Sequence, residues 1–114
     1  MGYVRHDAVI VVVDKDVSPD IVKFRDVLPP DIRGYLLGPA EGMNGYDSWV
    51  FAPDGSKEGW EHSIDAEEAR ESFLKMMKSV QKHRRDIVSL SFGEDHGYEY
   101  GTTIVYTSDG RVDA

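Results

Sequence analysis

Ala8-Val9-Ile10-Val11-Val12-Val13 is a continuous apolar run. It is far shorter than the roughly 20 residues that span a bilayer, and its β-branched side chains favour a strand. A strand that is apolar at every position is covered on both faces, or lies at the centre of a sheet beneath a layer of helices. We therefore predict a central strand here.

Helix signals follow this strand and recur in the second half of the chain. Ser18-Pro19-Asp20 combines a capping serine, a proline in the first turn and an acid near the positive end of the helix dipole, and Pro29-Pro30 marks the end of that helix. The spacing of apolar residues predicts a longer helix from Asp65 to about His83, with Asp65 and Glu68 as its capping box. Its predicted buried stripe consists of Ala66, Ala69, Phe73, Met76, Met77 and Val80.

Four further strands are predicted over residues 35–37, 47–52, 87–92 and 102–107, and Asn44-Gly45 predicts a hairpin turn between the first two. The order β-α-β-β-α-β-β predicts an α+β fold, a ferredoxin-like βαββαβ arrangement with an extra C-terminal strand. Two helices would then cover one face of a mostly antiparallel sheet with strand order 5-4-1-3-2. Other α+β arrangements of the same elements stay open. We expect one domain over residues 1–114, frayed at residues 1–4 and 110–114.

Composition excludes several functional classes. The chain has 114 residues, no cysteine and a net charge of −8. The lack of cysteine excludes a disulfide framework, a thiolate zinc finger and a cysteine nucleophile. The acidic balance disfavours direct nucleic-acid binding, which needs clustered positive charge. No apolar segment suggests export or a membrane anchor, so we expect a cytoplasmic protein.

The predicted topology brings three polar segments to one end of the sheet. Loops on the end of a rigid sheet are where function is normally carried. We therefore predict a binding surface there, composed of Arg5, His6, Asp7, Lys57, Glu58, Trp60, His62, Asp95, His96, Tyr98 and Tyr100.

Two features of this surface have competing interpretations. His6, His62 and His96 are candidate ligands for a divalent metal, although no local ligand spacing supports them, and the alternative is that they are solvated loop residues. No other cofactor is indicated. Trp60 is either an exposed anchor for a partner or a lid over the open end of the core, and the burial tendency of tryptophan favours the lid.

Three segments carry a resemblance to a known group of proteins. Tyr3-Val4-Arg5-His6-Asp7-Ala8, Asn44-Gly45-Tyr46 and the stretch APDGSKEGW at residues 52–60 resemble small uncharacterised proteins of bacteriophages that infect actinobacteria. The similarity covers roughly the first two thirds of the chain. It implies a phage accessory protein made in the cytoplasm of the bacterial host, and it implies no catalytic residue.

We predict a non-enzymatic protein that binds a host or phage macromolecule through this surface. The first alternative is a small metal-dependent hydrolase or nucleotide-binding protein that uses the histidines and carboxylates. The second is an acidic inhibitor that imitates DNA. A homodimer, formed through an open sheet face or an edge strand, is as compatible with the sequence as a monomer.

Overall fold

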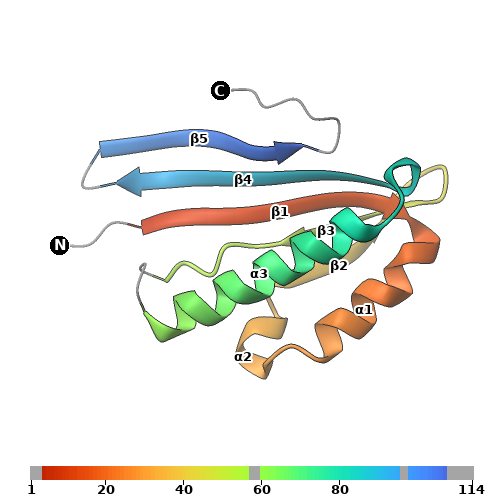
Figure 1. Ribbon diagram of the computed structural model, residues 1–114, viewed down its shortest axis with the longest axis horizontal. Helices are drawn as coiled ribbons and strands as arrows, with labels where there is room; N and C mark the ends of the chain where they lie inside the picture. The colour runs from red at the N-terminus through yellow and green to blue at the C-terminus, as the bar shows by residue number, and fades with distance from the viewer. Residues whose placement is uncertain (1–3, 57–59, 96–97, 108–114) are drawn as a thin grey trace.

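The computed structural model describes residues 4–56, 60–95 and 98–107 (Figure 1). The strands are β1 (Val4–Asp14), β2 (Leu36–Glu41), β3 (Tyr46–Phe51), β4 (Arg85–Asp95) and β5 (Tyr98–Thr107). The helices are α1 (Ser18–Asp26), the one-turn α2 (Pro30–Arg33) and α3 (Glu61–Ser79), with 3-10 turns η1 (Lys15–Val17) and η2 (Lys82–Arg84).

The five strands form one sheet in the order β2-β3-β1-β4-β5, and every neighbouring pair is antiparallel. The architecture is α+β, as predicted, and the strand order is the predicted one. The apolar strand β1 lies at the centre. Pro39 lies on the edge strand β2, where a missing backbone donor is tolerated.

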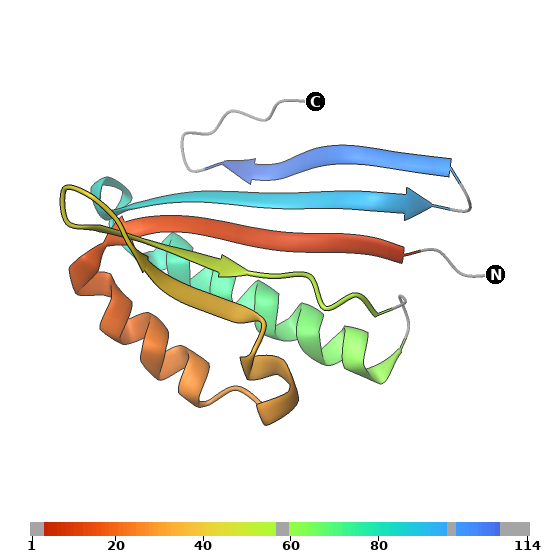
Figure 2. The ribbon, with the colours of Figure 1, turned by 180° about the vertical axis from the view of Figure 1, so that it is seen from behind.

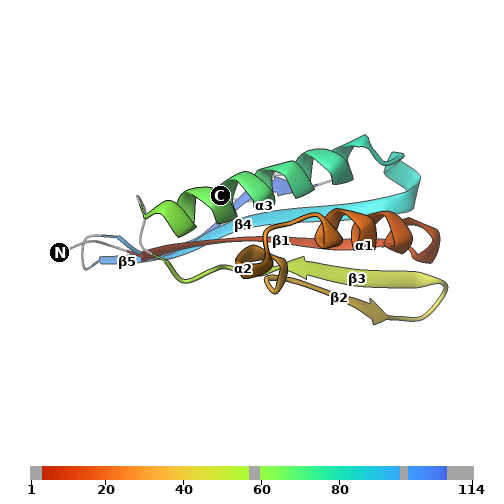
Figure 3. The ribbon, with the colours of Figure 1, turned by 90° about the horizontal axis from the view of Figure 1, so that it is seen from below.

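Helices α1 and α3 cover one face of the sheet, and no helix of the described residues lies on the opposite face (Figures 2 and 3). Side chains alternate between the two faces of a strand. Val9, Val11 and Val13 of β1 therefore point into the helix layer and are buried, whereas Ile10 on the other face is 37% exposed. The continuous apolar run thus supplies the core on one face only.

Aromatic side chains join the helices to the sheet in the core. The ring of Phe73 on α3 lies 5.7 Å from that of Phe24 on α1 and 5.9 Å from that of Phe51 on β3. Trp49 of β3 is fully buried, and its Nε1 donates to the hydroxyl of Ser18 at 3.0 Å.

The first helix begins differently from the prediction. Val17 is the N-cap residue of α1 and Ser18 is its first residue. Instead of capping the helix, the Ser18 hydroxyl donates to Asp47 Oδ2 at 2.5 Å, which links α1 to β3. The Pro29-Pro30 pair ends this region as predicted, but Pro30 also begins the short helix α2, which the sequence did not predict.

Helix α3 begins four residues earlier than predicted and ends at Ser79 instead of His83. The proposed capping box is therefore wrong, because Asp65 lies inside the helix and Trp60 is the N-cap residue. The predicted buried stripe is present, with Ala66, Phe73 and Met77 fully buried. Within the described residues, no helix combines the length and the apolar character needed to cross a membrane.

The hairpin turn between β2 and β3 is confirmed. Asn44 has φ 59° and Gly45 has φ 77°, the positive values that this turn requires. Strands β4 and β5 extend further than predicted, because their pairing continues to Asp95 opposite Tyr98. Val4, where fraying was expected, pairs with Glu94.

Candidate functional site

The start of β1, the loop after β3 and the β4–β5 hairpin lie at one end of the sheet (Figure 1). Arg5 of β1 is opposite Gly93 of β4. Strand β3 ends at Phe51, opposite Val9, and the chain then runs along β1 towards its beginning before α3 starts (Figure 2). The three polar segments therefore share this end.

The predicted surface residues differ in how fully they are placed. Backbone pairing of the strands puts Arg5, Asp95, Tyr98 and Tyr100 at this end of the sheet, and Lys57, Glu58 and His96 lie outside the described residues. The side chains of His6, Asp7, Trp60 and His62 are described, and they do not all face the same way.

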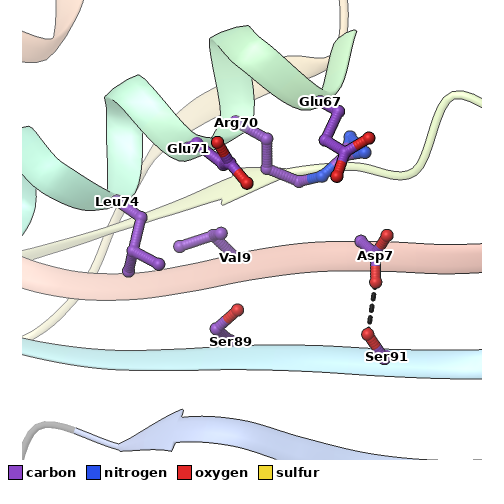
Figure 4. A pocket seen from close by; sticks show the side chains of 8 residues that line it. All are labelled: Asp7, Val9, Glu67, Arg70, Glu71, Leu74, Ser89 and Ser91. Atoms are coloured by element: carbon purple, nitrogen blue, oxygen red, sulfur yellow. Dashed lines mark hydrogen bonds between the residues drawn. The ribbon is translucent and has the colours of Figure 1, made fainter. Parts of the chain in front are cut away.

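His6 and Asp7 point to opposite faces of the sheet, as neighbours on a strand must. Asp7 lies on the helix face with Val9 (Figure 4). His6 lies on the uncovered face with Ile10, and its ring is 5.4 Å from that of Phe92. The predicted surface is thus divided between two faces.

This division separates two of the three proposed metal ligands. His62 lies in the first turn of α3, in the helix layer, whereas the side chain of His6 lies on the opposite face of the sheet. Among the residues that the structure describes, no group of three or more His, Cys, Asp or Glu side chains could hold a metal ion. His96 is outside that set. The convergence of His6 and His62 expected for a metal site does not occur.

His62 instead links the beginning of α3 to its surroundings. Its Nε2 is 3.2 Å from the hydroxyl of Tyr35 and 3.8 Å from Asp54 Oδ2, and its Nδ1 is 3.5 Å from Asp31 Oδ2 on α2. Ser56 also donates a hydrogen bond to Asp54. These contacts position the first turn of α3, and with it Trp60.

Trp60 is 56% exposed, so the expected lid over the core is wrong. Ile64, one helical turn later, is 49% exposed. We call these two side chains the Trp60–Ile64 pair. The following part of α3 is acidic at its surface, with exposed carboxylates at Glu61, Asp65, Glu67, Glu68 and Glu71.

A pocket of about 190 Å³ lies between α3 and the sheet (Figure 4). We call it the Arg70 pocket. Helix α3 contributes four lining residues, and β1 and β4 contribute two each: Glu67, Arg70, Glu71, Leu74, Asp7, Val9, Ser89 and Ser91. Ser91 donates a hydrogen bond to Asp7 across the two strands. The lining combines carboxylates, a guanidinium and hydroxyls with an apolar wall.

Arg70 is the unusual member of this lining. Its side chain is only 7% exposed, and its Nη1 is buried without a hydrogen-bond partner. The guanidinium carbon lies 5.8 Å from the centre of the Phe51 ring. A buried polar group is normally satisfied, and an exception calls for a physical explanation.

Sequence reasoning missed the Arg70 pocket, although two signals for it were present. Arg70 lies four residues after Ala66 and three before Phe73, so it occupies the apolar stripe of the helix, where a charged residue is unexpected. In β4 the residues facing the helices are Ile87, Ser89 and Ser91. Small polar side chains beneath a helix leave space.

A second, wider hollow of about 630 Å³ lies between the start of α1 and the β2–β3 hairpin. Ser18 and Asp47, which line it, are already hydrogen-bonded to each other. These two polar groups therefore serve the fold.

Comparisons with protein-family models, with curated proteins and with solved structures each found no match to this chain.

Proposed function

We propose that this chain is a non-enzymatic binding protein that engages a host or phage macromolecule through the Trp60–Ile64 pair, in the cytoplasm of the bacterial host. The observation that carries the proposal is the exposure of Trp60, at 56%, and of Ile64, four residues later, at 49%. Exposed tryptophan is typical of the anchor residues of interfaces. The His62 contacts hold the helix start that presents both side chains.

The charge around the Trp60–Ile64 pair defines the class of partner. The exposed side chains of α3 from Glu61 to Glu71 include five carboxylates, and Arg70, the basic residue in this segment, is buried. A complementary partner would offer an apolar pocket with a basic rim. We therefore expect a basic protein, and binding that weakens as salt is raised. The second alternative, an acidic inhibitor that imitates DNA, would bind a basic protein in the same way.

Binding fits the described chemistry better than catalysis does. Among the described residues that line the Arg70 pocket there is no histidine, cysteine or lysine. In the Ser91–Asp7 contact, the serine is hydrogen-bonded to a carboxylate and not to an imidazole base. These groups suit recognition of a ligand.

The proposal is tested by affinity capture from bacterial cells that express the tagged protein, with and without phage infection. We expect a basic protein to be enriched by the wild type and lost with Trp60→Ala. Met43→Ala is the matched control, because Met43 is 83% exposed in the β2–β3 turn and should capture the partner normally. Equal capture by Trp60→Ala, or capture of nothing, would contradict the proposal.

At the level of fold family, we propose a ferredoxin-like arrangement with an added fifth strand. The strand order and the position of both long helices on one face support it.

A second proposal concerns self-association through the uncovered sheet face. Leu37, Val50, Ile10 and Val88 are successive cross-strand partners on β2, β3, β1 and β4, and they form an apolar row across that face. Exposed apolar patches mark interaction sites. The acidic surface of α3 lies on the opposite side of the sheet, so two copies could meet here without bringing those carboxylates together. A second copy is therefore the proposed occupant.

A further inference from the structure

The guanidinium of Arg70 is enclosed but has few polar contacts among the described residues. The side chain is 7% exposed and Nη1 has no hydrogen-bond partner. In the described part of the chain the guanidinium contacts the ring of Phe51, and no ion pair joins it to a carboxylate. Figure 4 shows the guanidinium extending into the space between α3 and β1, above Asp7.

An enclosed guanidinium without an ion-pair partner is stabilised when a hydrogen-bond acceptor of a ligand binds to it. Removing a charged group from water is costly unless it is paired and hydrogen-bonded. A guanidinium presents a planar fork of donors, and a carboxylate matches this fork with two parallel hydrogen bonds. The adjoining cavity of about 190 Å³ gives such a group space to bind.

The other charges of the pocket restrict the ligand further. Asp7, Glu67 and Glu71 also line it, so among its described residues carboxylates outnumber the guanidinium three to one. A simple anion would be repelled by these carboxylates, and a simple cation would leave Arg70 without an acceptor. A ligand that carries both a carboxylate and an ammonium group satisfies both kinds of charge.

The rest of the lining fixes the size and the apolar part of the ligand. Val9 and Leu74 form an apolar wall, and Ser89 adds a hydroxyl (Figure 4). The volume is below the roughly 300–1,000 Å³ of pockets for drug-sized ligands. A molecule of amino-acid size therefore fits.

We infer that the Arg70 pocket binds a free α-amino acid with an apolar side chain. The ligand carboxylate pairs with the Arg70 guanidinium, and its ammonium group lies among the carboxylates of Glu67, Glu71 and Asp7. Its side chain packs against Leu74 and Val9. This site is distinct from the Trp60–Ile64 pair, but Glu67 and Glu71 belong both to its lining and to the acidic surface of α3.

The test measures the binding of three related ligands to the wild-type chain. Calorimetry gives the affinities, and amide chemical shifts of ¹⁵N-labelled protein locate the site. Leucine is expected to bind and to shift the signals of Val9, Leu74, Ser89 and Ser91. N-acetyl-leucine lacks the ammonium group and leucinamide lacks the carboxylate, so each should bind about tenfold more weakly or worse. Equal binding of a blocked analogue, binding of acetate alone with the same affinity, or no response to leucine and other apolar amino acids would overturn the inference.

Variants locate the site on the chain. Arg70→Met removes the guanidinium, and Arg70→Lys keeps the charge but loses the planar fork, so both should weaken leucine binding by about tenfold or more. Lys75→Gln, which removes an exposed positive charge from the same helix, is the matched control and should bind as the wild type does. Trp60→Ala should also bind leucine normally, which separates this result from the test of the proposed function. Unchanged affinity in folded Arg70→Lys protein would overturn the inference.

Discussion

Gly38 and Trp49 form a contact that only glycine permits. Gly38 has φ 139°, a region that side chains rarely adopt, and a Cβ atom there would lie 2.8 Å from ring atoms of Trp49. On α1, Arg25 lies with its guanidinium carbon 5.0 Å from the Trp49 ring centre, and it donates to the Gly38 carbonyl at 3.0 Å. The indole is thus fixed by β2 and by α1.

Gly38→Ala is therefore expected to destabilise the protein by about 2 kcal/mol or more, through backbone strain and overpacking. Gly34→Ala is the matched control, since Gly34 has φ −67° and nothing lies within 4 Å of its added Cβ. That change should be neutral or stabilising by less than about 1 kcal/mol. Urea denaturation of both variants measures the difference, and equal midpoints would contradict the packing described at Trp49.

At the scale of single residues, the sequence predicted positions better than environments. The spacing of apolar residues correctly located Phe73 and Met77 in the core. It could not show that Trp60 stays exposed, because burial depends on what the tertiary structure places over a side chain. The environment of Arg70 also depends on residues of α3, β1 and β4. The spacing of residues within α3 does not show which strand residues lie beneath it.

At the scale of elements, the end of α3 is held by a residue from the next strand. Arg85, the first residue of β4, is 5% exposed and donates to the carbonyls of Met77 at 3.1 Å, Val80 at 3.2 Å and Lys78 at 3.2 Å. The last carbonyls of a helix lack partners within the helix and carry its negative dipole end. Arg85 therefore caps α3 and fixes its junction with the sheet.

Arg85→Met should lower the free energy of unfolding by about 2–3 kcal/mol, because these helix carbonyls lose a buried charged donor. Arg84→Met is the control. Arg84 pairs with Asp14 at 3.4 Å, but both side chains are more than a third exposed, and such pairs contribute less than about 1 kcal/mol. Thermal and urea unfolding of the two variants test the order, and a larger loss in Arg84→Met would contradict the capping role.

The boundaries of the elements were predicted less well than their existence. The helix was predicted to run to about His83 but ends at Ser79, and only the structure identifies Arg85 as its capping side chain. The start of α3 was misplaced because Asp65 and Glu68 match the capping pattern. The helix instead begins after Trp60, where the contacts of His62 fix its first turn. Long-range contacts of this kind leave no local signal.

At the scale of the whole molecule, the central strand and one hairpin were predictable because their signals are local. The apolar run of β1 indicated the central strand, and Asn44-Gly45 fixed a hairpin. Which residues of β4 face the helices was not predictable, because its alternating serines and apolar residues suit either face. The apolar set, including Leu90 and Phe92, faces away from the helices, and this produces both the Arg70 pocket and the uncovered apolar face.

This uncovered face gives a prediction about assembly. Ile10→Lys places a charge at the centre of the apolar row. We expect the wild type to be a dimer and this variant to be a monomer. Sedimentation at micromolar protein concentrations measures the difference. Met43→Lys is the control. It adds the same charge to the exposed β2–β3 turn and should leave the dimer intact. A wild type that sediments as a monomer would contradict self-association through the sheet.

The most direct measurement of the central claim is hydrogen exchange of the protein alone and in complex with the captured partner. If the partner binds at the Trp60–Ile64 pair, exchange should slow in the first turns of α3 while the β2–β3 turn around Met43 stays unchanged. Slower exchange confined to other parts of the molecule, with residues 60–68 unaffected, would show that this end of α3 is not the binding surface.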